Sequence, residues 1–175
     1  SGKGKEIKYE LPVGGSVRLD VPPRCRPALA DPTVPLWMTE GQKKADALAT
    51  HGLCAAALLG VWNFLGKDRT GSTKLLADFD YIAWKGRTVN IVFDSDIMTK
   101  REVRMALDRL TEHLRRKGAV VNTVYLPPLP DGGKCGVDDY LLTHSVEELQ
   151  ALVLQPRPEI KPAPPQVQLL DDTPN

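Results

Sequence analysis

The stretch that most constrains the fold of this chain is residues 89–96, VNIVFDSD, an apolar run that ends in two carboxylates. Its β-branched residues predict a buried strand, because a run this apolar does not suit the edge of a sheet. Side chains alternate along a strand, so Asp94 and Asp96 project to one side. Two like charges this close repel unless a cation lies between them, and Mg2+ prefers carboxylate oxygens. For an isolated D-x-D motif, a solvated pair that caps the following helix is the simpler interpretation.

The composition predicts a single domain with a sizeable core, since the chain has 175 residues, of which 42% are hydrophobic and 26% charged. A net charge of +1 gives no indication of nucleic-acid binding. Three separated cysteines without a C-x-x-C pair argue against a disulfide framework and a structural zinc site. We expect a cytoplasmic protein, because no stretch has the length of a membrane span and no signal peptide opens the chain. The start at Ser1 leads us to expect a fragment of a longer protein.

Proline and glycine set the expected limits of the domain. Residues 1–35 are rich in both, which predicts an extended arm with a short strand near residues 16–21. The arginines of this arm favour a solvated surface over a nucleic-acid contact. Residues 36–154 form the expected domain. Repeated prolines over residues 155–175 predict a disordered tail or linker.

A strand, a tight turn and a helix precede the central strand. Residues 36–39 are apolar and end at a Glu-Gly pair, residues 42–51 have a helical apolar face, and Gly52 ends the helix. Residues 53–60 are a second apolar run of strand length. This β-α-β unit places Glu40 at the carboxyl end of its first strand, although a favourable interaction with the helix dipole is an equally good explanation for an acidic residue there.

The connection to the central strand, residues 61–87, follows no single period. We expect an exposed loop at residues 66–73 and a helix within residues 73–83. Core packing is the expected use of its aromatic residues, and a functional aromatic surface is the alternative.

After the central strand, residues 99–117 have apolar side chains at helical spacing and end at Gly118. The outer face of this helix carries an excess of positive charge that includes Arg104 and Arg109. A solvated face is favoured over a nucleic-acid contact. A further strand at residues 120–126 follows by a right-handed crossover.

The alternation of strands and helices predicts an α/β fold, with a mainly parallel sheet of about four strands and helices on both faces. Acidic residues follow three of these strands, and they are Glu40, Asp94, Asp96, Asp138 and Asp139. The last two precede a short helix that opens with a capping box at Ser145. Because carboxyl ends of parallel strands meet at one edge, we expect the uncompensated carboxylates of Glu40, Asp94 and Asp96 to form a single divalent-metal site there.

A strand-Glu-Gly-helix unit followed by an apolar strand that ends in D-x-D resembles the Toprim domain of topoisomerases and bacterial-type primases. The motifs that carry the resemblance are TEGQKKADAL (39–48), ALLG (57–60), FDSD (93–96) and KCGVDDYL (134–141). The resemblance covers residues 36–154 and is closest to Toprim-like domains of uncharacterised plasmid, phage and mobile-element replication proteins. It implies a Rossmann-like fold, and in such proteins a primase-like domain often accompanies a helicase.

The resemblance implies a primase-type nucleotidyl transferase in DNA replication, dependent on Mg2+ or Mn2+, that uses nucleoside triphosphates and a single-stranded DNA template. Glu40 would be the general acid/base or metal-organising residue, and Asp94 and Asp96 would hold the metal. The implied phosphate-binding lysines and the implied secondary acidic pair are Lys43, Lys44, Lys134, Asp138 and Asp139.

Two features depart from bacterial primases: no zinc-binding module is visible, and Ile97-Met98-Thr99 stands where many primases have a small residue and glycine. Toprim nucleases use the same acidic set, so cleavage remains an alternative to synthesis. A domain that only binds nucleic acid or recruits a helicase is a third possibility. The haloacid-dehalogenase pattern D-x-D-x-T/V fits less well, because the threonine comes one residue late and Glu40 has no role. Strand passage is set aside, since no tyrosine lies in a topoisomerase-like module.

Overall fold

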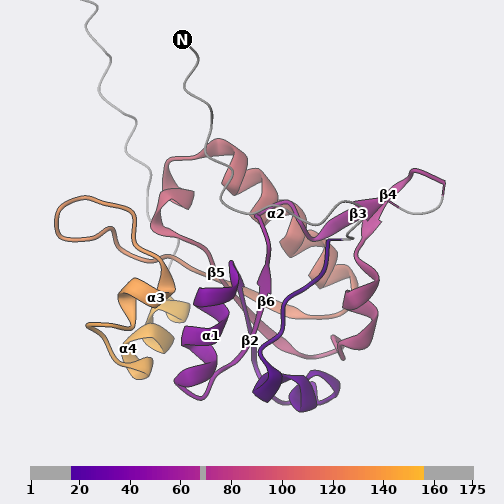
Figure 1. The fold of residues 1–175 in the computed structure, drawn as a ribbon, viewed down its shortest axis with the longest axis horizontal. Helices are drawn as coiled ribbons and strands as arrows, with labels where there is room; N and C mark the ends of the chain where they lie inside the picture. The colour runs from indigo at the N-terminus through magenta and orange to yellow at the C-terminus, as the bar shows by residue number, and fades with distance from the viewer. Residues whose placement is uncertain (1–16, 68–69, 156–175) are drawn as a thin grey trace, which may run out of the picture.

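A four-stranded parallel sheet with the strand order β2-β1-β5-β6 is the centre of the molecule (Figure 1). The computed structural model describes residues 17–67 and 70–155. The strands are β1 (Leu36–Glu40), β2 (Cys54–Leu58), β5 (Thr88–Val92) and β6 (Val120–Val124). The expected α/β fold with a mainly parallel sheet is confirmed.

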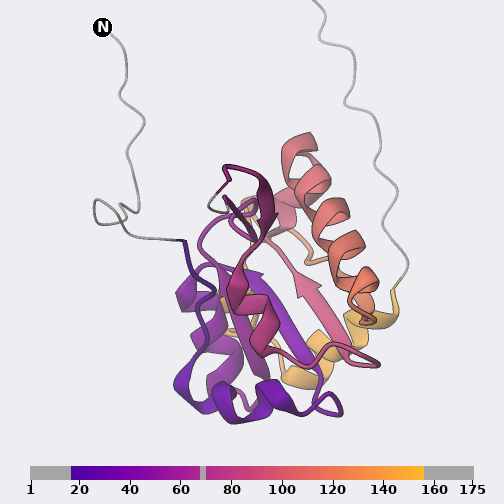
Figure 2. The same ribbon diagram turned by 90° about the vertical axis from the view of Figure 1, so that its right-hand side faces the viewer.

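The connections of the two central strands run in opposite directions. Helix α1 (Gln42–Thr50) leads from β1 out to β2, whereas α2 (Arg101–Arg116) leads from β5 out to β6. Since such crossovers are right-handed, the two helices cover opposite faces of the sheet (Figure 2). The strand order therefore reverses between β1 and β5, and open α/β sheets bind ligands beyond the carboxyl ends of the strands at such a point.

The sheet is buried because both faces are covered, and so β1, β2 and β5 are nearly continuous apolar runs. Asn90 is the polar exception in β5, with 6% of its surface exposed. Its side-chain oxygen accepts a hydrogen bond from Asn122 Nδ2 at 3.0 Å, and the two residues are directly paired between β5 and β6. Pairing across the sheet thus gives the buried side-chain oxygen of Asn90 a donor.

The connection from β2 to β5 differs from expectation. A hairpin of β3 (Leu65–Lys67) and β4 (Thr73–Leu75) replaces the expected loop, and the expected helix is reduced to a 3-10 helix, Ala77–Tyr81. The buried apolar residues of this segment are irregularly spaced along the chain, and Phe64 and Phe79 among them are fully buried. Because each is placed by a separate tertiary contact, the segment has no period that sequence reasoning could detect.

The N-terminal segment is less extended than expected. Residues Pro23–Ala30 form a 3-10 helix in which Cys25 is buried. The strand expected near residues 16–21 is a single antiparallel bridge between Asp20 and Ala57, which covers the outer edge of β2. Residues 1–16 of the expected arm and 156–175 of the expected tail lie outside the described residues.

The chain after β6 forms two short helices, α3 (Val137–Tyr140) and α4 (Val146–Ala151), and a 3-10 turn, Leu152–Leu154. The expected capping box is present, since Ser145 Oγ accepts from the Glu148 N–H and Glu148 Oε2 accepts from the Ser145 N–H. No helix in the described part of the chain is long and apolar enough to span a membrane.

Candidate functional site

Glu40 is the last residue of β1, and Gly41 makes the turn into α1. Gly41 has a φ of 91°, a backbone conformation that residues other than glycine rarely adopt. Its N–H donates to the Leu58 carbonyl at 2.8 Å. The Glu-Gly pair therefore ends the strand abruptly and holds Glu40 at the carboxyl edge of the sheet.

The two aspartates lie at the same edge, beyond the neighbouring strand. β1 and β5 are paired in parallel with Met38 opposite Ile91, so continuing the register places Glu40 level with Phe93, just before Asp94. Asp94 is 2% exposed, and Asp96 lies in the 3-10 helix Ser95–Met98 that follows. The structure thus brings Glu40, Asp94 and Asp96 to the point where the strand order reverses.

Three lysines from different segments pair with these aspartates. Lys44 Nζ of α1 lies 3.0 Å from Asp94 Oδ1, and Lys134 Nζ lies 2.5 Å from Asp94 Oδ2. Lys100 Nζ lies 2.6 Å from Asp96 Oδ2, and Lys134 is 3.7 Å from the same oxygen. The expectation of uncompensated aspartates is therefore wrong, because cations brought in by the fold offset their charge.

Glu40 is less well compensated than the aspartates. Burial raises its pKa, and the negative charge of Asp94 raises it further, with a smaller effect from Asp96; Lys44 and Lys134 only partly oppose this. A carboxyl group with a raised pKa among charged residues is suited to take up and release a proton.

Two hydrogen bonds between Ser95 and Cys135 hold the loop that contains Lys134 next to the end of β5. The Ser95 N–H donates to the Cys135 carbonyl at 2.9 Å, and the Cys135 N–H donates to Ser95 Oγ at 2.9 Å. Burial raises the pKa of the Cys135 thiol, which disfavours a reactive thiolate. These reciprocal bonds set where Lys134 meets Asp94.

Gly136 allows the same loop to approach the carboxylates closely. A Cβ at this position would lie 2.5 Å from Asp138 Oδ1, 2.6 Å from Lys44 Cε and 3.2 Å from Asp94 Oδ1. A side chain would therefore force these groups apart. Asp139 has a structural part in this arrangement, since its Oδ2 accepts from the Gly136 N–H at 2.9 Å.

Two carboxylate oxygens at this point, Asp94 Oδ1 and Asp138 Oδ1, are buried and have no hydrogen-bond partner. The contact of Lys44 with Asp94 Oδ1 is thus an ion pair without hydrogen-bond geometry. Buried oxygens of this kind fit a hard divalent cation, which takes oxygen ligands from one or two carboxylates. Within residues 17–67 and 70–155, no group of three or more His, Cys, Asp or Glu side chains is already arranged around a metal position.

Other expected site residues lie farther out. Lys43 is exposed on α1 and, in the described part of the chain, is not among the lysines that pair with Asp94 or Asp96. Arg104 is half-buried and Arg109 exposed on α2, and Arg109 lies about 12 Å along the helix from its start. The structure does not bring these three residues to the carboxylates.

Sequence reasoning missed the contributions of Ser95, Lys100 and Gly136. Lys100 had a detectable signal, since it follows Asp96 by four residues, the spacing at which side chains meet on a helical turn. The bonds of Ser95 and the close packing of Gly136 cross 40 or more residues or depend on several segments at once, so no local pattern indicates them.

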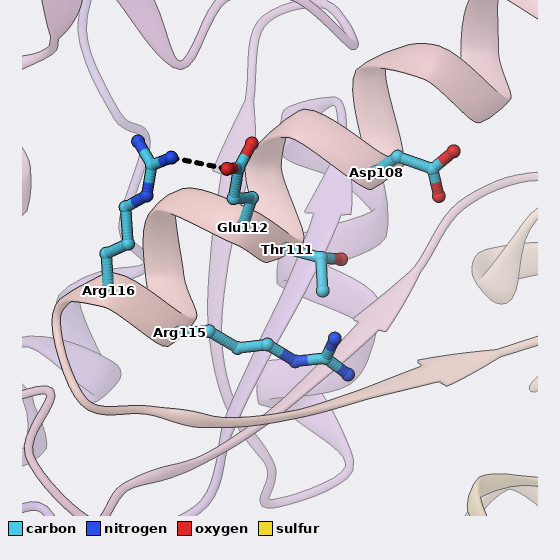
Figure 3. Close-up of a pocket in the computed structure, with 5 residues that line it drawn as sticks. All are labelled: Asp108, Thr111, Glu112, Arg115 and Arg116. Carbon is cyan, nitrogen blue, oxygen red and sulfur yellow. Dashed lines mark hydrogen bonds and ion pairs between the residues drawn. The ribbon is translucent and has the colours of Figure 1, made fainter.

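A concavity lies on the outer face of α2, away from these residues (Figure 3). It has a volume of about 530 Å³ and is lined by Asp108, Thr111, Glu112, Arg115 and Arg116. Arg116 pairs with Glu112, and Arg115 Nη2 donates to the Val121 carbonyl at 3.4 Å. Its arginines are thus engaged with the protein itself, and we assign the chemistry to the carboxylate site instead.

Comparison with known proteins identifies a family of undescribed activity. A protein of Picosynechococcus sp. (strain ATCC 27264 / PCC 7002 / PR-6), named as uncharacterized, is 32% identical over 130 residues, and the match covers 69% of this chain but only 13% of that protein. A crystal structure of the Aquifex aeolicus primase, with its zinc-binding and RNA polymerase domains, is similar with a TM-score of 0.47 and 19% identity over 74% of this chain and 27% of that one. The model of the domain of unknown function DUF3854 matches residues 27–148, most of the described chain. The chain therefore belongs to the DUF3854 family.

Proposed function

We propose that this chain is a Toprim-type domain that carries out Mg2+-dependent nucleotidyl transfer, of the primase type, in a DNA replication protein of a mobile element. The observation that carries the proposal is the meeting of Glu40 with Asp94 and Asp96 at adjacent strand ends, where the strand order reverses. The raised pKa of Glu40 and the surrounding lysines support the same reading. The motifs that resemble Toprim domains point to nucleotidyl transfer as the reaction.

Each residue has a role in this reaction. Asp94 and Asp96 would hold the cation, with Asp138 beside them. Bound Mg2+ would offset the negative charge of a triphosphate and of the reacting oxygens. Lys134 has a half-exposed side chain and would bind phosphate, with the more buried Lys44 behind it. Glu40 would accept the proton of the attacking 3′-hydroxyl.

The cation site is tested by thermal unfolding of the chain with Mg2+ or Mn2+. A cation that binds only the folded state must raise the Tm, by about 2.7 kcal/mol of stabilisation at a hundred times its Kd. Asp94→Asn combined with Asp96→Asn should abolish this rise without unfolding the domain. The matched control is Asp108→Asn with Glu112→Gln, which also removes two carboxylates but on the outer face of α2. An undiminished rise in the first double variant would refute the site.

The reaction itself is tested with nucleoside triphosphates, a single-stranded DNA template and Mg2+ or Mn2+, on this chain and on any longer protein that contains it. Glu40→Gln and Asp94→Asn should each abolish primer formation. A labelled strand incubated without nucleotides belongs in the same assay. Its shortening in a Glu40-dependent way, with no primers formed, would replace synthesis with cleavage.

A binding-only domain is the second candidate, and the lysine contacts favour it. Because Lys44, Lys100 and Lys134 already pair with the aspartates, the acidic residues have a structural use without a metal. Such a domain would bind nucleic acid or a helicase. It predicts neither a cation-dependent rise in Tm nor a product, with nucleic-acid or helicase binding intact.

A further inference from the structure

The side chain of Lys134 lies between the two aspartates of the candidate site. Its Nζ is 2.5 Å from Asp94 Oδ2 and 3.7 Å from Asp96 Oδ2. Within the described part of the chain, no other lysine or arginine pairs with both carboxylates, since Lys44 pairs with Asp94 and Lys100 with Asp96. A divalent cation held by both aspartates would take the position that the Lys134 ammonium fills.

The backbone next to Lys134 is fixed, but its side chain is free to turn. Lys134 belongs to the loop between β6 and α3, which projects from the side of the molecule (Figure 1). The next residue, Cys135, is buried, and both its N–H and its carbonyl are hydrogen-bonded to Ser95. The side chain of Lys134 is 52% exposed and has a flexible four-carbon stem. Its ammonium can therefore leave the aspartates by rotation of its own side chain, without movement of the loop.

Lys44 does not have this freedom. Its side chain is 20% exposed and approaches Asp94 from helix α1, at Oδ1 rather than the Oδ2 that Lys134 contacts. Its stem lies against Gly136, where an added Cβ would be only 2.6 Å from Lys44 Cε. Lys44 is thus the fixed counter-ion of Asp94, and Lys134 is the one that can be exchanged.

We propose that Lys134 is an exchangeable counter-ion, which fills the cation position until Mg2+ displaces it and then binds the phosphates of the incoming nucleoside triphosphate. A divalent cation offsets two carboxylates better than one ammonium does, and the two cations repel each other too strongly to share the position. The displaced ammonium stays within one side-chain length of the bound cation, and substrate phosphates bind Mg2+ directly in such sites. The cation therefore binds first and the triphosphate second. This inference rests on the proposed function, because it concerns the regulation of the same site.

Amine labelling of the whole chain with a succinimidyl ester, followed by mass spectrometry, tests the exchange. Lys134 should react slowly in EDTA and about fivefold faster in excess Mg2+, the effect of losing a partly exposed ion pair. Inorganic triphosphate added to the excess Mg2+ should make the reaction slow again. The matched controls are Lys43 and Lys85, which are exposed and should keep their rates throughout.

Lys134→Met gives a second test, through thermal unfolding. Without the ammonium, Mg2+ has nothing to displace and should raise the Tm at a lower concentration than in the unchanged protein. Lys100→Met is the matched control, because it removes one charge paired with Asp96 but none from between the aspartates. It should change the required concentration less. An equal change in both variants would mean that only the net charge matters, which contradicts the exchange.

The remaining outcomes separate this inference from the proposed function. If Mg2+ raises the Tm but leaves the labelling rate of Lys134 unchanged, the exchange is wrong and the cation site stands. If Mg2+ raises the Tm of neither the unchanged protein nor Lys134→Met, the cation site is rejected and the exchange with it. A rise confined to Lys134→Met would mean that the ammonium is never displaced, which also overturns the exchange.

Discussion

At the scale of single residues, Glu40 carries its charge in an unfavourable environment. Its pKa is raised by burial and by Asp94, so the folded protein binds a proton at Glu40 more readily than the unfolded chain does. Stability therefore falls as the pH rises from the ordinary glutamate value through the raised value, and the full penalty is present above it. A residue that costs stability in this way is typical of a functional site.

We expect Glu40→Gln to stabilise the fold at neutral pH while it abolishes the proposed reaction. The gain should be on the order of 0.5 kcal/mol, the range of a partly screened charge interaction, and should disappear below the ordinary pKa of glutamate. Urea unfolding of both proteins between pH 3 and 8 measures it. Glu112→Gln, which removes an exposed carboxylate paired with Arg116, should show no such gain. A variant that is less stable at neutral pH would mean that Lys44 and Lys134 outweigh the burial of Glu40.

At the scale of secondary structure elements, one buried cation holds the N-terminal 3-10 helix to the sheet. Arg87 is fully buried just before β5, and burial lowers its pKa. Its guanidinium donates to the carbonyls of Leu29 at 2.8 Å and Ala28 at 3.0 Å, at the end of the helix Pro23–Ala30. The same carbonyls accept from the backbone N–H groups of Ala83 and Asp31, so the guanidinium is a second, charged donor to each of them.

Arg87→Met should lower the free energy of unfolding by about 2–4 kcal/mol, because two buried hydrogen bonds from a charged group are lost. Urea unfolding at neutral pH measures the change. Arg116→Met is the matched control on the surface, where an exposed pair with Glu112 contributes about 0–0.5 kcal/mol. Equal stability of Arg87→Met and the unchanged protein would show that the contacts of Cys25 are enough to hold the helix.

At the scale of the whole molecule, the carboxylate site and the hairpin are separable parts of one scaffold. β3 and β4 form a sheet of their own, outside the main sheet. The segment leaves the core at Phe64 and returns at Leu76, and the Leu76 N–H donates to the Phe64 carbonyl at 3.0 Å. Since these two residues are already hydrogen-bonded as in a hairpin, a two-residue turn can join them.

Replacement of residues 65–75 by Asn-Gly should therefore leave the domain folded, with a Tm lower by only a few degrees, the effect of about 1 kcal/mol. The rise in Tm with Mg2+ should persist, because the hairpin is not part of the main sheet that carries the carboxylates. Thermal unfolding with and without Mg2+ measures both effects. Loss of the cation effect would mean that the hairpin also shapes the carboxylate site.

Local patterns in the sequence predict much of the main sheet. Apolar runs of strand length, helical spacing over α2 and glycines that end helices all depend on neighbouring residues, and each of these elements is confirmed. The connection of residues 59–87 is different, because Phe64, Phe79 and Arg87 obtain their places from distant partners. The β3–β4 hairpin and the 3-10 helix Ala77–Tyr81 of this connection therefore escaped prediction, as did the 3-10 helix Pro23–Ala30 to which Arg87 is bonded.

The sequence by itself determined which acidic residues lie at the ends of the strands, since Glu40-Gly41 and the D-x-D motif are visible as strand ends followed by turns. Only the tertiary structure decided that β1 and β5 are neighbours, which brings Glu40 beside Asp94, and that Lys44, Lys100 and Lys134 meet the aspartates. Strand order and ion pairs between segments depend on how the whole core packs. The raised pKa of Glu40 follows from that packing, because burial and the nearness of Asp94 exist only once the sheet has formed.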